Sequence, residues 1–503
     1  MKNVLAALAV LLMFACEQKD TGFSTNGFMI DLNDKGQITK LADAKSEKNY
    51  TRVNPENVLM AIRVNNQFEY PGIMSFDKDQ SMITLEYPKN QVSAAILVSQ
   101  ETDYLTFELK SLSNKEKVEL VLWGPFQTNI KETVGETIGV VRNKDFSIGI
   151  QALNIRTLGG YPSSEDDSTP SYNIFSTTSL VDIADSLNIL YRGHTALPKE
   201  YGSSLQAYTS KDRVVAAMNH EKYVAPAYED AGVVGSKIAI FGCAPELVLD
   251  VIEKIELTEG LPHPMLDGVW AKRAISASSA YLIQGFNSDN IDDAIELTQK
   301  AGLKYLYQGG PFENWGHFDL HKKGFPDNWE SMKMCVEKAE KAGLKVGAHT
   351  LSNFITTNDP YVTPVPDPRL AKVGSSTLVK AIDDKEKNIE IESPDFFNQM
   401  KNNSLHAVVI GEEIIRYETV SEEKPWVLLN CERGAFDTNV ASHSKGDKIS
   451  KLADHGYKTF LTNTDLSLEV SGKLAELYHQ TGLKQISFDG LEGNASTGMG
   501  AYG

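Results

Sequence analysis

A chain of 503 residues is longer than a single hydrophobic core usually supports, so the sequence predicts two or three domains. Its formal net charge of −18 would repel a phosphate backbone, and we therefore expect no nucleic-acid partner. The four cysteines are widely spaced and form no C-x-x-C pair, which supports neither a disulfide framework nor a zinc knuckle.

Residues 1–16 carry a predicted targeting signal. Lys2 precedes an apolar run from Val4 to Phe14, which is too short to cross a hydrocarbon core of ~30 Å and fits a signal peptide. Ala15-Cys16 resembles a bacterial lipoprotein cleavage site, so we expect lipidation at Cys16 and an outer-membrane lipoprotein that faces the periplasm or the cell surface. Residues 17–25 are then a charged tether. The alternative is an ordinary signal peptide that happens to contain a cysteine.

Residues 26–260 are predicted to form an antiparallel β-sandwich. The strands Phe28–Leu32 and Gln37–Leu41 flank the segment 33–36, where Asn, Asp and Gly favour a tight hairpin turn. More β structure is expected at 207–240, followed by a short helix at 245–253. Further short strands follow the hairpin at regular spacing: Val58–Val64, Met82–Tyr87, Ala94–Val98, Tyr104–Leu109 and Val118–Trp123.

The pattern changes after Leu261-Pro262-His263-Pro264, a stiff connector at which we place the domain boundary. Residues 261–503 alternate between strands and amphipathic helices, which indicates a parallel sheet with right-handed crossovers. Trp270 is expected to open the first β unit. Three helices are expected to end alike, with a glycine before a short strand, at Gly302, Gly343 and Gly482.

These units predict a (β/α)8-type barrel, so the fold class is multidomain β plus α/β. A small β insertion at 370–450 interrupts it and is expected to have an accessory role, and the strand Lys458–Asn463 follows the insertion. Such a barrel typically needs about 250 residues, and the predicted strands number about five. Either the sheet is open or the chain is a fragment that lacks the rest of its barrel, and we favour the second interpretation, a barrel that is incomplete in this chain.

The main catalytic candidates are two carboxylates after the last predicted strand. Asp489 directly follows the run Ile486-Ser487-Phe488, and Glu492 lies three residues later. Hydrolysis of a glycosidic bond needs one carboxylate as nucleophile or base and another as acid. The alternative is that Asp489-Gly490 is an ordinary turn pair and that Glu492 is a solvated loop residue.

A second group of candidates lies in the loop after the strand at 305–307. Trp315, His317 and Asp319 suit a carbohydrate subsite, because aromatic rings stack on sugar rings while His and Asp bind hydroxyls. Alternatively, Trp315 is a core residue and the histidines lie on the surface. Trp329 falls on a helical stripe, so we expect it in the core.

The same loop allows a metal site. His317, Asp319 and His321 could ligate an ion, with His349 at the end of the next strand as a further ligand. We rank this possibility second and predict no metal in the primary site.

Further substrate-binding candidates are His349 and Asn353 after the strand at 346–349, and Trp270 with Lys272 at the first β unit. Asp359 could bind a hydroxyl or simply form the turn before Pro360. The chain has no phosphate-binding Gly-rich loop and no G-x-S-x-G elbow, and we expect no cofactor.

One longer pattern consists of Trp315-Gly316-His317, Phe325-Pro326-Asp327, Ala342 to Gly347, Leu461 to Asp465 and Thr481 to Gly490. This pattern resembles the first half of the catalytic barrel of α-galactosidase-type glycoside hydrolases, which also place a β-sandwich before the barrel. The resemblance implies that Asp489, at the end of the fourth strand, is the nucleophile of a retaining mechanism, with an acid/base from a later strand. The family has a Lys where Ser487 stands, and its paired acids after the first strand have no counterpart after Val269-Trp270.

The sequence thus predicts a lipid-anchored glycoside hydrolase that acts on an extracellular oligo- or polysaccharide. Two alternatives remain open. One is a metal-dependent hydrolase that uses His317, Asp319 and His321, and the other is a surface carbohydrate-binding lipoprotein without catalytic activity.

Overall fold

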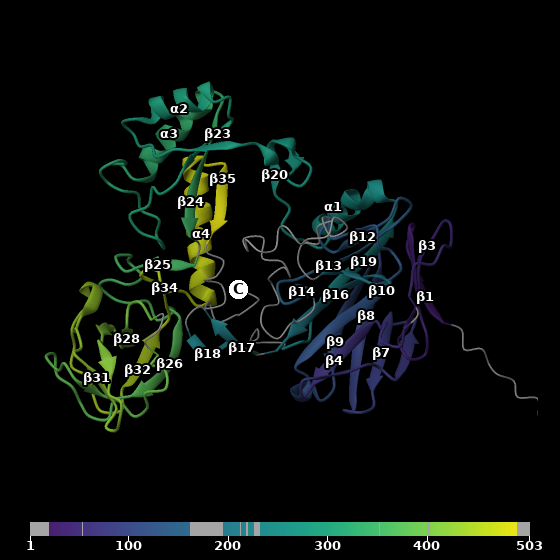
Figure 1. The fold of residues 1–503 in the computed structure, drawn as a ribbon, viewed down its shortest axis with the longest axis horizontal. Helices are drawn as coiled ribbons and strands as arrows, with labels where there is room; N and C mark the ends of the chain where they lie inside the picture. The colour runs from purple at the N-terminus through teal and green to yellow at the C-terminus, as the bar shows by residue number, and fades with distance from the viewer. Residues whose placement is uncertain are drawn as a thin grey trace, which may run out of the picture. The chain divides into compact units, whose positions relative to one another are not determined.

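The computed structural model describes residues 20–52, 54–160, 195–211, 213–217, 220–225, 232–351, 353–399 and 403–489. It contains two compact units (Figure 1). Unit 1 comprises residues 1–210 and 233–261, and unit 2 comprises residues 211–232 and 262–503. Cys16 with the predicted signal peptide, and the acid Glu492, lie outside the described residues. In the described ranges no helix is long and apolar enough to cross a membrane.

Unit 1 consists of two large antiparallel sheets and a small one. The first large sheet has the order β11 (Thr133–Val134), β12 (Val140–Arg142), β13 (Ser147–Ala152), β19 (Lys237–Cys243), β9 (Tyr104–Leu112), β8 (Val92–Gln100), β7 (Met82–Tyr87), β6 (Ile73–Asp77). The second has the order β14 (Leu158–Gly159), β16 (Gly202–Ser210), β10 (Leu120–Thr128), β4 (Met60–Val64), β5 (Gln67–Glu69), with β15 (Ala196–Lys199) beside β16. The small sheet is β1 (Thr21–Ser24), β2 (Phe28–Leu32), β3 (Ile38–Asp43).

The two large sheets share one hydrophobic core. In β8 every second side chain over Val92–Val98 is buried, as the period of two in a strand requires. Strands of both sheets bury side chains in the same cluster, so the sheets face each other as a sandwich. Buried polar atoms are paired across it: Trp123 Nε1 donates to Ser236 Oγ at 2.8 Å, and the Tyr87 hydroxyl donates to the Met60 carbonyl at 2.9 Å.

Several predicted elements of unit 1 occur as expected. β2 and β3 form the predicted hairpin, and β7 has the predicted bounds. The short predicted helix is a 3-10 turn at Pro245–Leu247 followed by α1 (Val248–Thr258). The segment 207–240 differs, because β17 (Arg213–Ala217) and β18 (His220–Ala225) form a hairpin that groups with unit 2 and not with the sandwich.

Unit 2 contains a four-stranded parallel sheet in which the spatial order follows the chain order. Its strands are β22 (Tyr281–Ile283), β23 (Tyr305–Gln308), β24 (Lys345–Leu351) and β35 (Gln485–Asp489). The connections carry α2 (Ile291–Lys300), α3 (Trp329–Lys341) and α4 (Thr464–Thr481). Among the described residues β22 and β35 are the outer strands, so a closed barrel is not seen.

Two expected strands of this sheet lie elsewhere. Trp270 belongs to the antiparallel hairpin of β20 (Met265–Leu266) and β21 (Val269–Trp270), so the first parallel strand is Tyr281–Ile283, which the sequence analysis missed. The predicted strand at 458–463 is β34 (Thr459–Leu461), which pairs antiparallel with β25 (Phe354–Thr356). The strand with which β34 pairs, and not the sequence of β34 itself, determines the sheet to which it belongs.

Three glycines end the helices of unit 2 as predicted. Gly302, Gly343 and Gly482 have φ of 70°, 77° and 80°, a left-handed conformation that other residues adopt at a cost. Each glycine reverses the chain directly before a parallel strand. The repeated joint therefore sets the start of β23, β24 and β35.

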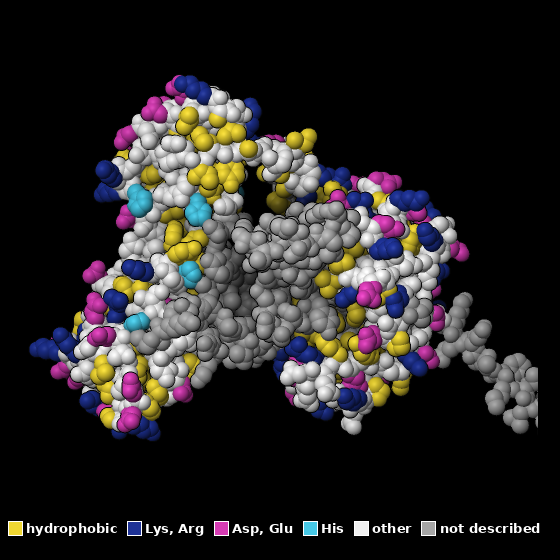
Figure 2. Space-filling model, viewed as in Figure 1, with side chains coloured by type: hydrophobic (Ala, Val, Ile, Leu, Met, Phe, Trp, Pro, Cys, Tyr) yellow, Lys and Arg dark blue, Asp and Glu magenta, His cyan; other side chains and the backbone are white. Residues whose placement is uncertain are grey.

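One face of the parallel sheet is uncovered near its first strand. Tyr281 and Ile283 are 42% and 63% exposed. Figure 2 shows hydrophobic side chains gathered over the part of unit 2 that carries β23 and β35. The opposite face packs on helices, and Leu306, Val346 and Ala348 lie in that core.

The insertion between β24 and α4 folds around a hydrophobic core of its own. Besides β25, β34 and β33 (Asp454–His455), it contains two small antiparallel sheets. The first is β26 (Lys372–Thr377), β32 (Lys448–Leu452), β28 (Ala407–Ile410), β29 (Glu413–Arg416), and the second is β27 (Ile389–Glu390), β31 (Val427–Leu429), β30 (Thr419–Val420).

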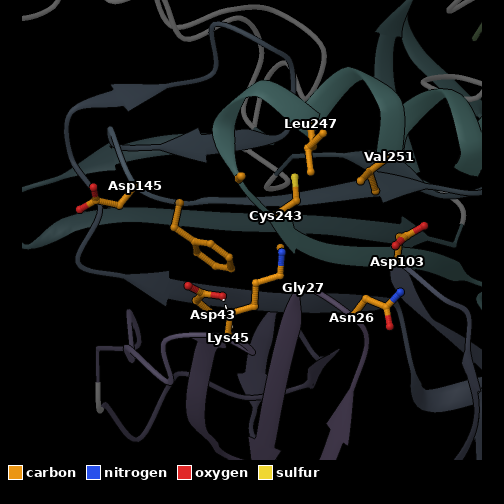
Figure 3. Close-up of a pocket in the computed structure, with 12 residues that line it drawn as sticks. Asn26, Gly27, Asp43, Lys45, Asp103, Asp145, Cys243, Leu247 and Val251 are labelled. Atoms are coloured by element: carbon orange, nitrogen blue, oxygen red, sulfur yellow. Dashed lines mark hydrogen bonds between the residues drawn. The ribbon is translucent and has the colours of Figure 1, made fainter.

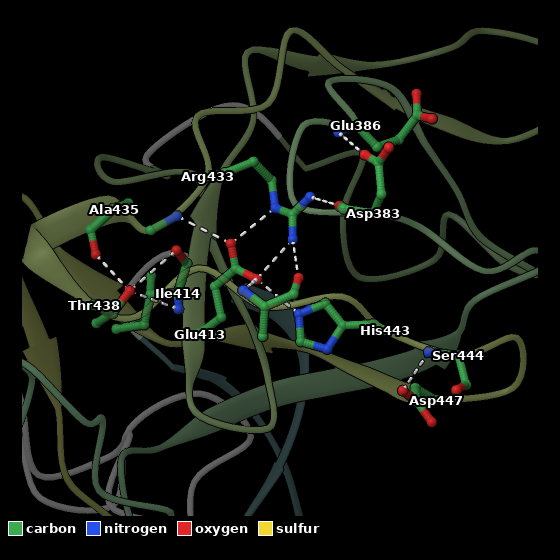
Figure 4. A network of polar contacts seen from close by, with 12 residues as sticks. Asp383, Glu386, Glu413, Ile414, Arg433, Ala435, Thr438, His443, Ser444 and Asp447 are labelled. Carbon is green, nitrogen blue, oxygen red and sulfur yellow. Dashed lines mark hydrogen bonds and ion pairs between the residues drawn. The ribbon is translucent and has the colours of Figure 1, made fainter.

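A buried carboxylate organises the loops of the insertion (Figure 4). Glu413 is fully buried and accepts two hydrogen bonds from Arg433, both at 2.8 Å, and one from His443 Nε2 at 2.7 Å. The backbone N–H groups of Gly434 and Ala441 also donate to it, at 3.0 and 3.2 Å. One side chain thereby holds the segment 433–443 against β29.

Burial alone would raise the pKa of Glu413, but the hydrogen bonds from Arg433 and His443 outweigh burial and hold the pKa below its usual range. A carboxylate with a lowered folded-state pKa stabilises the fold above its unfolded-state pKa of ~4.3. That contribution is lost as the pH falls through the folded-state pKa.

Replacing Glu413 by Gln should destabilise the insertion by about 3–5 kcal/mol, because the neutral amide leaves the buried Arg433 charge without a carboxylate of opposite charge. Hydrogen–deuterium exchange of β28 and β29 at pH 7 measures this local stability. The matched control is Glu412→Gln at the adjacent exposed position, which should change exchange little. The difference between Glu413→Gln and the unmodified chain should shrink below pH ~4. Equal protection of the two variants at pH 7 would contradict this role.

Candidate functional site

The parallel strands of unit 2 bring their carboxyl ends to one edge of the sheet. Leu351 pairs with Asp489, and His349 pairs with Ser487. We call this edge, with the loop 309–328 after β23 and the segment 353–369 after β24, the sheet rim. Side chains at such an edge are not buried in the core, so parallel α/β proteins bind ligands there.

Strand alternation places successive side chains on opposite faces of the sheet. Ile486 packs in the core on the helix side of the sheet. On the other face the hydroxyls of Tyr307 and Ser487 form a hydrogen bond, with 2.7 Å between Tyr307 Oη and Ser487 Oγ. A Cβ at Gly347 would lie 2.8 Å from the Tyr307 ring, so glycine makes room for this contact. Asp489 lies two residues beyond Ser487, and its backbone position continues the same row.

His317 and Asp359 form a pair at the rim that the sequence did not predict. Asp359 is fully buried, and its Oδ1 lies 2.9 Å from His317 Nδ1. Its Oδ2 accepts the His317 backbone N–H at 2.8 Å, and Oδ1 also accepts the Tyr361 N–H at 2.9 Å. The contact of Nδ1 with a carboxylate oxygen is that of a donor, and it leaves Nε2 as the ring nitrogen not engaged by Asp359.

The pair leaves His317 accessible. Its side chain is 28% exposed, and its ring lies 4.4 Å from that of Tyr361, measured between centroids. Within the described part of the chain Nε2 has no hydrogen-bond partner. A histidine oriented through Nδ1 by a buried carboxylate, with Nε2 open, can bind a hydroxyl or transfer a proton.

A second layer of charges supports Tyr361. Its hydroxyl donates to Glu469 of α4 at 2.6 Å, and Arg369 donates to the other oxygen of Glu469 at 2.6 Å. Burial and the hydrogen bond to Glu469 raise the pKa of Tyr361 above its usual range. Tyr361 and Arg369 in turn lower the pKa of Glu469. The segment 359–369 is thereby fixed to α4.

The metal-ligand pattern of the loop does not converge. His317 faces Asp359, whereas His321 Nδ1 lies 2.6 Å from exposed Glu313. Asp319 instead ties the loop together, because its oxygens accept from Asn314 Nδ2 at 3.0 Å and Asn328 Nδ2 at 2.8 Å. Searching the described residues finds no group of three or more His, Cys, Asp or Glu that could hold a metal ion.

The two tryptophans near the rim pack partly into the core. Trp315 is half-buried against two hydrophobic clusters, and its backbone N–H donates to Thr356 Oγ1 at 3.1 Å. Trp329 begins α3, packs on the core as predicted, and donates from Nε1 to the Phe318 carbonyl at 2.9 Å. Trp315 keeps part of its ring surface open at the rim.

The other predicted site residues lie at different places. His349 is half-buried on β24 in register with Ser487, and Asn353 is buried and accepts from Ser467 Oγ of α4 at 3.1 Å. Trp270 is buried, stacks on His263 and has Lys272 over its ring at 5.0 Å.

The hairpin that carries Trp270 is tied to the start of β24, not to its end. Asp267 Oδ2 in its turn lies 2.5 Å from Nζ of Lys345, the first residue of the strand. The structure thus places His349 and Asn353 on the rim strand and its continuation, and it does not bring Trp270 and Lys272 to them.

The comparisons with known proteins give distant likenesses. No protein-family model and no curated protein matches the chain. Similar solved structures include the α-N-acetylgalactosaminidase NagBb of Bifidobacterium bifidum, with 9% identity, a TM-score of 0.44, and coverage of 94% of this chain and 70% of that chain. Another is the GH36 α-galactosidase AgaA of Geobacillus stearothermophilus, with 8% identity, a TM-score of 0.31, and coverage of 70% and 59%. These proteins are at most distant relatives, and at TM-scores below 0.5 the likeness assigns no chemistry to this chain.

Replacing Gly316 by Ala should disrupt the pair of His317 and Asp359. Gly316 has φ of 126°, and an added Cβ would lie 2.7–2.8 Å from the Asp359 carboxylate. The strained backbone conformation of an alanine at this position would by itself lower the free energy of unfolding by about 1–3 kcal/mol. The measurement is the free energy of unfolding together with the His317 imidazole NMR signals.

The matched control is Gly310→Ala in the same loop, where an added Cβ meets nothing within 4 Å. The control should leave the histidine signals unchanged. Unchanged signals in Gly316→Ala would show that the contact does not constrain His317.

Proposed function

We propose that this chain is a glycoside hydrolase that acts on an extracellular oligo- or polysaccharide by a retaining mechanism, with Asp489 as the nucleophile. The observation that carries the proposal is the position of Asp489. It is the last residue of the fourth parallel strand, in register with Leu351 and one alternate position beyond Ser487. Carboxylates at that edge meet ligands in parallel α/β proteins.

The neighbouring rim residues suit a sugar. Trp315 keeps part of an aromatic ring open, and the open Nε2 of His317 accepts a hydrogen bond from a hydroxyl. The buried carboxylate of Asp359 fixes the imidazole orientation, so little entropy is lost when the hydroxyl binds. His317 is thus a substrate-positioning residue in this proposal.

The chemistry requires two carboxyl groups. Asp489 attacks the anomeric carbon and forms a glycosyl-enzyme ester while an acid protonates the leaving oxygen, and water then hydrolyses the ester. In retaining enzymes the two groups stand ~5–5.5 Å apart. Glu492, three residues after Asp489, is our candidate for the second group.

Replacing Asp489 by Asn should abolish turnover, with a loss of more than about 10³-fold, because the amide cannot form the ester. The resemblance to α-galactosidase-type sequences makes aryl α-galactosides the first substrates to test. Asp384→Asn, at an exposed position of the insertion, is the control and should retain full activity. NMR of the first product should show the anomeric configuration of the substrate.

Three results would overturn parts of this proposal. Full activity of Asp489→Asn excludes this nucleophile, and an inverted product excludes the retaining mechanism. Glycan binding by the unmodified chain without any release of reducing sugar would favour the carbohydrate-binding alternative. Activity that is lost with a chelator and restored by zinc would favour the metal-dependent alternative.

We also propose that the protein is anchored to the outer membrane through lipidated Cys16. Cells grown with radiolabelled palmitate should incorporate label into the unmodified chain and not into Cys16→Ser. Cys243→Ser, which changes a buried thiol of unit 1, is the control and should remain labelled. Label in the Cys16→Ser chain would contradict the anchor.

A further inference from the structure

Unit 1 contains a cavity of about 310 Å³ that has no part in the sheet rim (Figure 3). Its walls come from loops of the sandwich near β2, β3, β9 and β13, from the end of β19, and from the first turn of α1. Binding cavities for small molecules span about 300–1,000 Å³, so this one lies at the small end of that range.

One wall of the cavity is apolar. Phe146 and Val251 are 2% and 6% exposed, and Leu247 borders the opening at 43%. Burial raises the pKa of the Cys243 thiol to about 12, so this side chain is neutral at physiological pH. The wall therefore offers hydrophobic surface without charge.

The rest of the lining is charged and of mixed sign. Asp43, Asp103 and Asp145 contribute carboxylates from three different loops, and Lys45 contributes an ammonium group. Figure 3 shows the Lys45 side chain running from the Asp43 turn toward Cys243. Lys45 is exposed, its charge helps to lower the pKa of Asp43, and among the described residues no hydrogen bond or ion pair occupies its three ammonium donors.

The three carboxylates are partly engaged but keep acceptor positions, and Asp103 Oδ2 accepts from Lys254 Nζ at 2.5 Å. Asp43 accepts from the Lys45 N–H at 2.9 Å and from Ser46 Oγ at 2.6 Å. Burial alone would raise the pKa of Asp43, but these hydrogen bonds lower it, and the group stays ionised. Asp145 has only a long ion pair of 3.6 Å with Lys48, and each carboxylate offers about four acceptor positions.

This arrangement discriminates among ligands. A phosphate or carboxylate would meet three like charges, and a simple amine, although the net negative lining attracts it, would leave the apolar wall wet. A neutral sugar satisfies every group, since its hydroxyls donate to the carboxylates and accept from the ammonium while its C–H face covers the apolar wall. We infer that this cavity is a binding site for a neutral pyranose, separate from the candidate catalytic site.

Calorimetric titration of the full chain with galactose, glucose, mannose and N-acetylgalactosamine tests the site. At least one sugar should bind, and Lys45→Ala and Asp145→Ala should each weaken that binding about tenfold or more, because each removes charge-assisted hydrogen bonds. The titration is repeated in the Asp489→Asn background, which alters only the candidate catalytic site. The sandwich site should be unaffected by that change, which separates this inference from the proposed function.

Lys35→Ala is the matched control. Lys35 lies in an exposed turn of unit 1, and its N–H donates to the side chain two residues earlier, as that of Lys45 does. This variant should bind with unchanged affinity. The inference is overturned if no sugar binds, if sugar binding is equal in Lys45→Ala and Lys35→Ala, or if inorganic phosphate or methylammonium binds at Lys45 and the sugars do not.

Discussion

The parallel pairing of β24 with β35 is the constraint on which the candidate site depends. The chain leaves the sheet at Leu351 and returns only at Gln485, so the insertion and α4 lie between two strands that are neighbours in space. The Tyr478 hydroxyl of α4 lies 3.1 Å from the Ala348 carbonyl of one strand and 2.8 Å from the Gln485 carbonyl of the other. Part of the insertion packs in a core of its own, whereas Leu405, Ala407 and Ile414 pack in the same core as the parallel sheet.

Two fully buried carboxylates show how the loops of unit 2 are held. Glu413 and Asp359 are both inaccessible to water, and each accepts hydrogen bonds from side-chain and backbone donors. Burying such a charge is costly unless its lone pairs are satisfied, so loops that satisfy them become well defined. All the hydrogen bonds that Glu413 accepts come from residues of the insertion. Asp359, in contrast, contacts Nδ1 of His317 and leaves Nε2 of that ring accessible at the rim. That difference separates a structural carboxylate from one that supports a site.

The two units offer different surfaces to a carbohydrate. At the rim of unit 2, the loop after β23 carries Trp315 and His317, and Asp489 ends β35, an arrangement on which the proposed bond cleavage rests. In unit 1, carboxylates and an unpaired ammonium border an apolar wall, which suits binding without chemistry. If both proposals hold, two weak sites on one chain would raise the effective concentration of a polymeric substrate.

Local patterns in the sequence determined much of the framework. Alternation predicted β7 and β2–β3, and the glycines at 302, 343 and 482 predicted where three parallel strands begin, because periodicity and positive φ depend on near neighbours. The position of Asp489 at a strand end followed from the same signals. Only the tertiary structure decided that His317 meets Asp359, 42 residues away, or that Trp270 sits in a hairpin outside the parallel sheet. Such pairs depend on which segments meet in space, and no local period in the sequence encodes that choice.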